Sequence, residues 1–136
     1  MNDQQTSNRK LMANTSSFDD LLNTKQKKLA FFQNLLLVAI ADGYLDKKES
    51  DFLVSIGQQL NLTEEDTRPI ADNLSVLSFI IPDEGLHRTL ELQTLVMMVM
   101  QDGKLADAEY ELCQEYARRI GYSQDFLDDL IEQLGQ

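Results

Sequence analysis

The chain has 136 residues, enough for one domain with a hydrophobic core, and its 43% hydrophobic content excludes a disordered protein. Twelve lysines and arginines against 23 acids give a net charge of −11, which disfavours nucleic acid and anionic lipid surfaces and favours cations or basic partners. With one cysteine and one histidine, the chain forms neither an internal disulfide nor a Cys/His zinc site, and we expect a cytoplasmic protein. Because the N-terminus has no apolar run and no segment approaches the length of a membrane span, we expect neither a signal peptide nor a span.

The N-terminal part predicts a tail followed by a long helix. Residues 1–16 are polar and have no sustained period, which indicates a flexible N-terminal tail. Ser17 is a candidate N-cap for a short helix that carries Phe18, Leu21 and Leu22. A long helix follows over residues 24–41, and its second half is apolar on nearly every side, which is typical of a central helix.

A glycine and a capping pattern mark the next turn. Gly43 follows the long helix and supplies the left-handed conformation that ends it. Asp46 is then expected to be the N-cap of a second helix, with Glu49 completing a capping box. The predicted buried stripe of this helix is Phe52, Leu53, Ile56 and Leu60.

The middle of the chain is less regular. Because proline fits only the first turn of a helix, Pro69 predicts a short helix or turn at 63–67 and a new helix near 68–78. Residues 79–82 form an apolar connector, and Asp83 is expected to cap the helix that follows.

The C-terminal part predicts three further helices. A second central helix covers residues 84–101 and ends at Gly103, a helix over 107–120 buries Cys113, and Ser123 caps the last helix. No segment alternates with period two for long. The predicted fold class is therefore all-α, a compact helical bundle of about six or seven helices.

Part of this pattern occurs twice. Residues 35–62 and 95–122 align at an offset of 60 positions, which places Asp42 on Asp102, Gly43 on Gly103, Leu45 on Leu105 and Glu49 on Glu109. We therefore expect one domain over residues 17–136, built from two pseudo-symmetric helical repeats at about 24–62 and 84–122.

The acidic turns of the repeats are the candidate functional site. Asp42 and Asp102 each stand at the C-terminal end of a helix, where the helix dipole disfavours a carboxylate. Three interpretations remain open: a local Asx turn, a weak site for calcium or magnesium, and a docking site for a basic partner. The candidate metal ligands are Asp42, Asp46, Glu49, Asp102 and Glu109.

The turns are not EF-hands. Their second half matches an EF-hand loop, but Val38 and Ile40 stand at the first and third ligand positions, and neither side chain binds calcium. A cation site would therefore need backbone carbonyls, water or another part of the fold.

Other residues with reactive side chains have ordinary explanations. His87 is expected to face solvent, and Cys113 to be a buried, inert thiol. Met97, Met98 and Met100 are expected in the core. There is no glycine-rich phosphate loop and no nucleophile elbow, so we expect no enzyme.

The chain repeats a pattern in which the turn ADG-x-L-D-x-x-E joins two helices. This pattern resembles the TerB-like family of bacterial tellurite-resistance proteins. It is also similar to the N-terminal domain of a membrane-anchored DnaJ-type co-chaperone. The resemblance covers roughly residues 24–135 and implies a compact helical fold with internal pseudo-symmetry, a link to tellurite and general stress resistance, and cation binding by the acidic residues, but no enzyme activity. The motif positions that the resemblance carries over are Asp42, Gly43, Asp46, Glu49, Asp102, Gly103 and Glu109. Ala106 departs from the motif and leaves the second turn one acid short.

Two functional hypotheses follow. The first is a non-enzymatic TerB-like stress module that binds a divalent cation or a partner at the acidic turns, with no other cofactor. The alternative is an interaction adaptor in which the turns are only helix caps, and in which residues 79–81 or a helix face hold another protein or a second copy of the chain.

Overall fold

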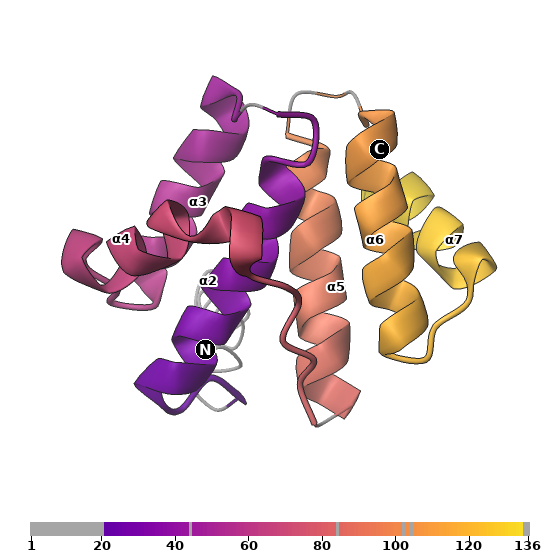
Figure 1. The fold of residues 1–136 in the computed structure, drawn as a ribbon. Coiled ribbons are helices and arrows are strands. Elements are labelled where there is room, and N and C mark those ends of the chain that lie inside the picture. Colours follow the sequence, from indigo (N-terminus) through magenta and orange to yellow (C-terminus); the bar gives the residue numbers. More distant parts are fainter. Residues whose placement is uncertain (1–20, 44, 84, 102, 104, 135–136) are drawn as a thin grey trace, which may run out of the picture.

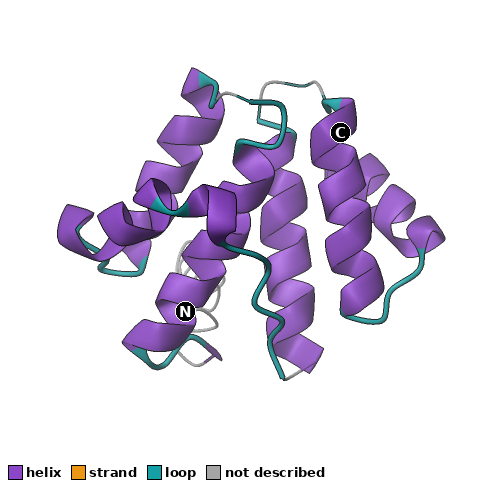
Figure 2. Ribbon diagram, viewed as in Figure 1, coloured by secondary structure: helices purple, strands orange, loops and turns teal. Residues whose placement is uncertain are grey.

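A computed structural model describes residues 21–43, 45–83, 85–101, 103 and 105–134. All regular structure within these residues is helical, which confirms the all-α prediction (Figures 1 and 2). The expected tail over residues 1–16, the cap at Ser17 and the acid at Asp102 lie outside the described residues. The elements are α2 (Lys25–Ala39), α3 (Lys47–Gln59), α4 (Glu64–Asp72), the short 3-10 helix η1 (Leu74–Val76), α5 (Gly85–Val99), α6 (Asp107–Arg119) and α7 (Gln124–Leu134).

Two helices, α2 and α5, lie side by side at the centre of the bundle (Figure 1). Helices α3 and α4 pack against α2, while α6 and α7 pack against α5. Both central helices are buried over most of their circumference, as their apolar sequences predict. The fully buried side chains include Phe31, Leu35, Val38, Leu92, Leu95 and Val96. No described helix combines the length and the apolar character that a membrane span needs.

The turns that follow the central helices lie at the same end of the bundle, the top of Figure 1. Gly43 and Gly103 have φ angles of +98° and +78°, in the left-handed region where only glycine is unstrained. The helices on either side have matching lengths of 15 and 13 residues in both halves. The pseudo-symmetry of the two repeats stays a prediction.

The outer helices α3 and α6 each bury one stripe. In α3 the stripe contains Leu53 and Ile56 and continues to Leu60, whereas Phe52 is only half-buried. In α6 it contains Cys113 and Tyr116, as expected from the sequence. Helix α7 begins after Ser123, whose Oγ accepts a hydrogen bond of 3.1 Å from the backbone nitrogen of Phe126 and confirms the predicted cap.

The prediction for residues 63–78 is wrong. One helix, α4, runs through Pro69, and it is followed by η1 instead of a second helix. Thr63 and Asp66 form a complete capping box that fixes the first turn of α4. Pro69 then removes only one backbone hydrogen bond, and Asn73 Nδ2 donates to the Pro69 carbonyl oxygen at 2.6 Å near the end of the helix.

The connector over residues 77–83 is held against α2 by two consecutive amide side chains. Gln33 Nε2 donates to the Ser78 carbonyl oxygen at 2.8 Å. Asn34 Oδ1 accepts from the backbone nitrogen of Ile80 at 2.9 Å, and Asn34 Nδ2 donates to the Ile80 carbonyl oxygen at 2.8 Å. Because these bonds satisfy backbone groups outside any helix, the connector has a defined path across the face of the bundle.

The methionine prediction is correct only in part. Met98 is fully buried and Met100 packs against the core, but Met97 is 44% exposed. Met97 therefore lies on the outer side of the last turns of α5, where the helix is less enclosed by its neighbours.

Candidate functional site

The first acidic turn joins α2 to α3. The backbone nitrogen of Gly43 donates to the Ile40 carbonyl oxygen at 2.9 Å and closes the end of α2. Asp46 Oδ1 accepts from the backbone nitrogen of Glu49 at 2.8 Å, which confirms Asp46 as the N-cap of α3. Asp42 is exposed in the turn. The first turn therefore uses one of its acids, Asp46, as a helix cap.

The second acidic turn joins α5 to α6 with related geometry but a different cap. The backbone nitrogen of Gly103 donates to the Met100 carbonyl oxygen at 3.0 Å. Ala106 occupies the N-cap position and has no side-chain acceptor, while the backbone nitrogen of Ala106 donates to Glu109 Oε1 at 3.4 Å. The acid of this turn, Asp102, lies outside the described residues. The second turn therefore keeps only the glutamate half of a capping box.

Glu49 and Glu109 meet inside the bundle. Their exposed fractions are 3% and 4%, and their carboxyl groups lie close enough to interact directly. Burial, the hydrogen bond to Glu109, the negative charge of Glu109 and then Asp46 raise the pKa of Glu49 above its ordinary value. Two buried carboxyl groups in contact cannot both ionise at low cost, so the pair retains a proton near neutral pH.

This contact changes the predicted role of Glu49. We expected its carboxyl group to return to the backbone of Asp46 in a capping box, but that part of the prediction is wrong. The carboxyl group instead contacts Glu109 and Asp46. The structure thus places Glu49 close to Glu109 and to Asp46, while Asp42 is exposed in the turn.

The sequence contains a signal for this pair. Glu49 stands four positions before Leu53, and the buried stripe continues at Ile56. Glu109 stands four positions before Cys113, and that stripe continues at Tyr116. A residue four positions before a buried one lies on the same face of a helix, so the spacing places both glutamates on the inner faces of α3 and α6.

Cys113 lies one turn after Glu109 and is fully buried, as predicted. Burial, and to a smaller extent the charge of Glu109, raises the pKa of the Cys113 thiol to about 12. The thiolate is the reactive form of cysteine, so this side chain is protected from oxidation and metal binding in the folded protein.

A second buried polar cluster involves the histidine, and it corrects the prediction that His87 faces solvent. His87 is only 7% exposed, and its Nε2 lies 3.1 Å from Oε2 of Glu91, one helical turn further along α5. Glu91 is 1% exposed, and its Oε1 accepts a hydrogen bond from Asn34 Nδ2. Burial, followed by the negative charge of Glu91, raises the pKa of Tyr116. Glu91 thus supplies a buried negative charge between α2, α5 and α6, which sequence analysis missed.

Comparisons with known proteins identify a family. A family model described as tellurite resistance protein TerB matches residues 1–72, which include the first acidic turn, α3 and α4. No curated protein and no solved structure matches the chain. The suggested relationship to a DnaJ-type co-chaperone stays a prediction. Because the match covers more than half of the 136 residues, the chain belongs to the TerB family.

Proposed function

We propose that the protein is a non-enzymatic TerB-like module that binds a divalent cation, calcium or magnesium, at the acidic end of the bundle. The observation that carries this proposal is the contact between Glu49 and Glu109, which come from different helical pairs and meet beside the cap residue Asp46. Carboxylate oxygens are the ligands that both cations prefer. The two acidic turns therefore contribute to one site and not to two separate ones.

A cation at this position would replace the proton that the two glutamates retain and would neutralise their charges. The described residues contain no group of three or more acids, histidines or cysteines that could hold a metal ion. The remaining ligands would therefore be backbone carbonyls, water, or the carboxylates of Asp42 and Asp102, which stand beside Gly43 and Gly103 in the sequence. Such a site binds weakly, because few of its ligands are already in place.

Thermal melting of metal-free protein tests the proposal. A ligand that binds only the folded state raises the melting temperature, so millimolar calcium or magnesium should raise it for the wild type. Glu109→Gln should lose most of the shift relative to its own metal-free baseline. Glu65→Gln, a substitution of an exposed glutamate in α4, should keep it. An unchanged melting temperature in the wild type, with Asp42→Asn also without effect, would exclude the cation site.

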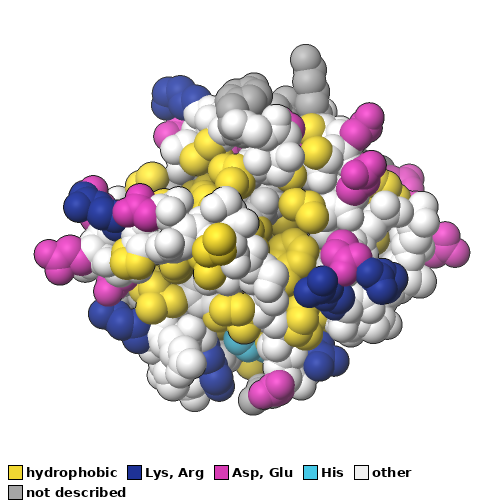
Figure 3. Space-filling view, viewed as in Figure 1, with side chains coloured by type: hydrophobic (Ala, Val, Ile, Leu, Met, Phe, Trp, Pro, Cys, Tyr) yellow, Lys and Arg dark blue, Asp and Glu magenta, His cyan; other side chains and the backbone are white. Residues whose placement is uncertain are grey.

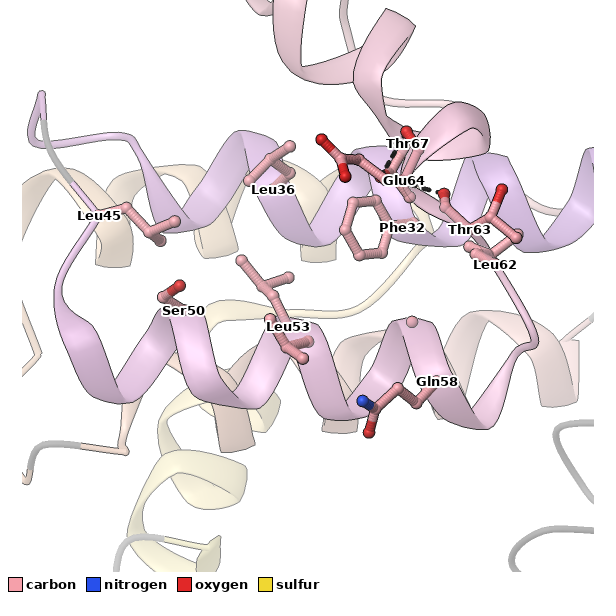
Figure 4. A pocket seen from close by; sticks show the side chains of 12 residues that line it. Phe32, Leu36, Leu45, Ser50, Leu53, Gln58, Leu62, Thr63, Glu64 and Thr67 are labelled. Atoms are coloured by element: carbon pink, nitrogen blue, oxygen red, sulfur yellow. Dashed lines mark hydrogen bonds between the residues drawn. The ribbon is translucent and has the colours of Figure 1, made fainter.

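The alternative is an adaptor that binds another copy of the chain, and an apolar groove favours it. A groove of about 360 Å³ lies between α2, α3 and α4, with Phe32, Leu36, Leu45 and Leu53 among its lining residues (Figure 4). Val54 also lines it and is 57% exposed. Hydrophobic side chains are exposed in addition across the face that carries η1 and the connector (Figure 3). Exposed apolar surface of this kind is typical of interaction sites.

Sedimentation velocity distinguishes the two functions. An adaptor that pairs with itself should dimerise between micromolar and millimolar concentration, and Val54→Glu should return it to a monomer because a charge in an apolar interface is costly. A monomer at every concentration would exclude self-association through the groove and leave the cation proposal unaffected.

A further inference from the structure

The two halves of the bundle differ in how completely their third helix covers the first two. Helix α7 packs against both α5 and α6, and Leu127 of α7 is fully buried. Helix α4 packs against α2 but makes few contacts with α3, and the apolar groove of about 360 Å³ lies between these three helices. The first half is therefore open at a place where the second half is closed by its own helix.

Small side chains account for the groove. At the offset of 60 positions that aligns the two halves of the sequence, Ser50 corresponds to Tyr110. At the same offset, Thr67 corresponds to Leu127. The hydroxyl group of Tyr110 donates to Asp128 Oδ1 of α7 at 2.5 Å, so its side chain joins α6 to α7. Ser50 and Thr67 instead line the groove, on the α3 and α4 sides respectively (Figure 4), and the groove lacks the aromatic ring and the leucine of the other half.

The remaining lining of the groove is mainly apolar. Phe32 and Leu36 contribute from α2, and Leu45 and Val54, both exposed, contribute from the α3 side. Exposed apolar side chains around a hollow of this size fit a helix that inserts an aromatic and an aliphatic side chain at i and i+3 or i+4. The groove thus suits the same kind of amphipathic helix that α7 supplies to α5 and α6.

The charge around the groove selects the polar face of such a helix. Residues 46–72 contain seven acids, one of them buried, and three bases. Two of the bases are already in ion pairs, Lys47 with Asp51 and Arg68 with Glu64. A helix with basic residues on its polar face complements this surplus of acids. A second copy of the chain, with its net charge of −11, is the less favourable occupant.

We propose that the groove binds an amphipathic helix of a partner protein, with an aromatic and an aliphatic anchor on its apolar face and basic residues on its polar face. The anchors correspond to the side chains of Tyr110 and Leu127 in the other half of the bundle. The proposal requires no cation at the acidic turns, and it differs from self-association in the occupant of the groove.

Two peptides based on α7 test the occupant with the full chain. One peptide has the sequence of residues 123–134, and the other carries lysine at its four acidic positions, which are Asp125, Asp128, Asp129 and Glu132. Both have the same apolar face. In fluorescence anisotropy, the lysine peptide should bind at least about tenfold more tightly than the acidic one. No binding of the lysine peptide at millimolar protein concentration, or equal binding of the two peptides, overturns the proposal.

A third peptide separates the groove from general attraction between a basic peptide and an acidic protein. It has the composition of the lysine peptide in an order that breaks the apolar face. It should bind at least about tenfold more weakly than the lysine peptide, because its apolar side chains cannot enter the groove together. Equal binding would mean that charge alone is recognised, which contradicts a helix site.

Ser50→Tyr fills the groove with the side chain that Tyr110 supplies in the other half. It should weaken binding of the lysine peptide at least about tenfold and keep or raise the melting temperature, because the added ring covers exposed apolar surface. Ser55→Tyr adds the same side chain at an exposed position of α3 outside the groove and should leave binding unchanged.

Thr67→Leu fills the groove from the α4 side and decides the question if Ser50→Tyr does not fold. Unchanged binding of the lysine peptide to a folded Ser50→Tyr or Thr67→Leu protein would contradict the assignment of the groove. Dimerisation of the wild type that the same substitutions abolish would assign the groove to a second copy of the chain and overturn the proposed occupant.

Discussion

The carboxyl group of Glu49 lies against that of Glu109 inside the bundle, although the two residues are 60 positions apart in the sequence. Each is the third residue of its helix, in α3 and α6 respectively, and each is almost completely buried. The pair joins the two outer helices at the end of the bundle where both acidic turns lie (Figure 1). It is therefore both a structural contact and the centre of the candidate site.

This contact predicts that the protein loses stability as the pH rises. The folded-state pKa of Glu49 is raised from its ordinary value of 4.5, so above that pH the folded state binds more protons than the unfolded state. The stabilising contribution is complete below pH 4.5 and is lost progressively as the pH increases towards the folded-state pKa. Urea denaturation at pH 5, 7 and 9 measures the trend.

The variant Glu109→Gln isolates the effect of the pair. It removes the like charge and keeps a hydrogen-bonding group of the same size, so its free energy of unfolding should fall less steeply with pH than that of the wild type. The exposed residue Glu65 provides the control, and Glu65→Gln should follow the wild-type slope. If all three proteins have the same slope, the glutamate pair does not share a proton in solution.

Local signals explain how much of this fold could be predicted from the sequence. The glycine turn at Gly43 and the caps at Asp46 and Ser123 depend on a few consecutive residues, and all three are confirmed. The central helices could be predicted for the same reason, because a continuous apolar sequence is also a local signal. The helix break predicted at Pro69 is wrong, because the capping box of Thr63 and Asp66 starts α4 early enough for the helix to continue through the proline.

The buried polar contacts depend on which helix faces which, and this information is not local. His87 and Glu91 look like surface residues in isolation, but α5 lies against α2, where the side chain of Asn34 donates to Glu91. The carboxyl pair similarly requires α3 and α6 to approach at their first turns. Spacing within each helix places Glu49 and Glu109 on inner faces, and only the tertiary structure shows that the two faces meet.

The unequal caps of the two outer helices predict opposite effects of two substitutions. Asp46→Ala removes the acceptor of the Glu49 amide and should lower the free energy of unfolding by about 1 kcal/mol. Ala106→Ser supplies the acceptor that α6 lacks, in a residue that already has the extended backbone of an N-cap, and should raise it by about 0.5–1 kcal/mol. Urea denaturation measures both changes, and a destabilised Ala106→Ser protein would contradict the cap assignment.

Two glycines predict a similar contrast. Gly43 has a φ of +98° and open space where a Cβ would lie, so Gly43→Ala should destabilise the protein by about 1–2 kcal/mol through backbone strain alone. Gly57 lies within α3, where an added Cβ would be 3.7 Å from Phe32, an ordinary contact distance. Gly57→Ala should therefore stabilise the protein by about 0.5–1 kcal/mol. Thermal melting of both variants against the wild type checks the sign of each change.

Asn34 is expected to be among the most sensitive residues outside the apolar core. Its fully buried side chain satisfies both backbone groups of Ile80 and one oxygen of Glu91. Asn34→Ala leaves these groups buried without their partner and should lower the free energy of unfolding by about 2–5 kcal/mol. Gln33→Ala is the matched comparison. Within the described part of the chain, the side chain of Gln33 makes one hydrogen bond, to the Ser78 carbonyl oxygen, so its loss should cost about 1 kcal/mol. Equal destabilisation of the two variants in urea would mean that water replaces the contacts of Asn34, and that the connector and the carboxylate of Glu91 are not held by this side chain.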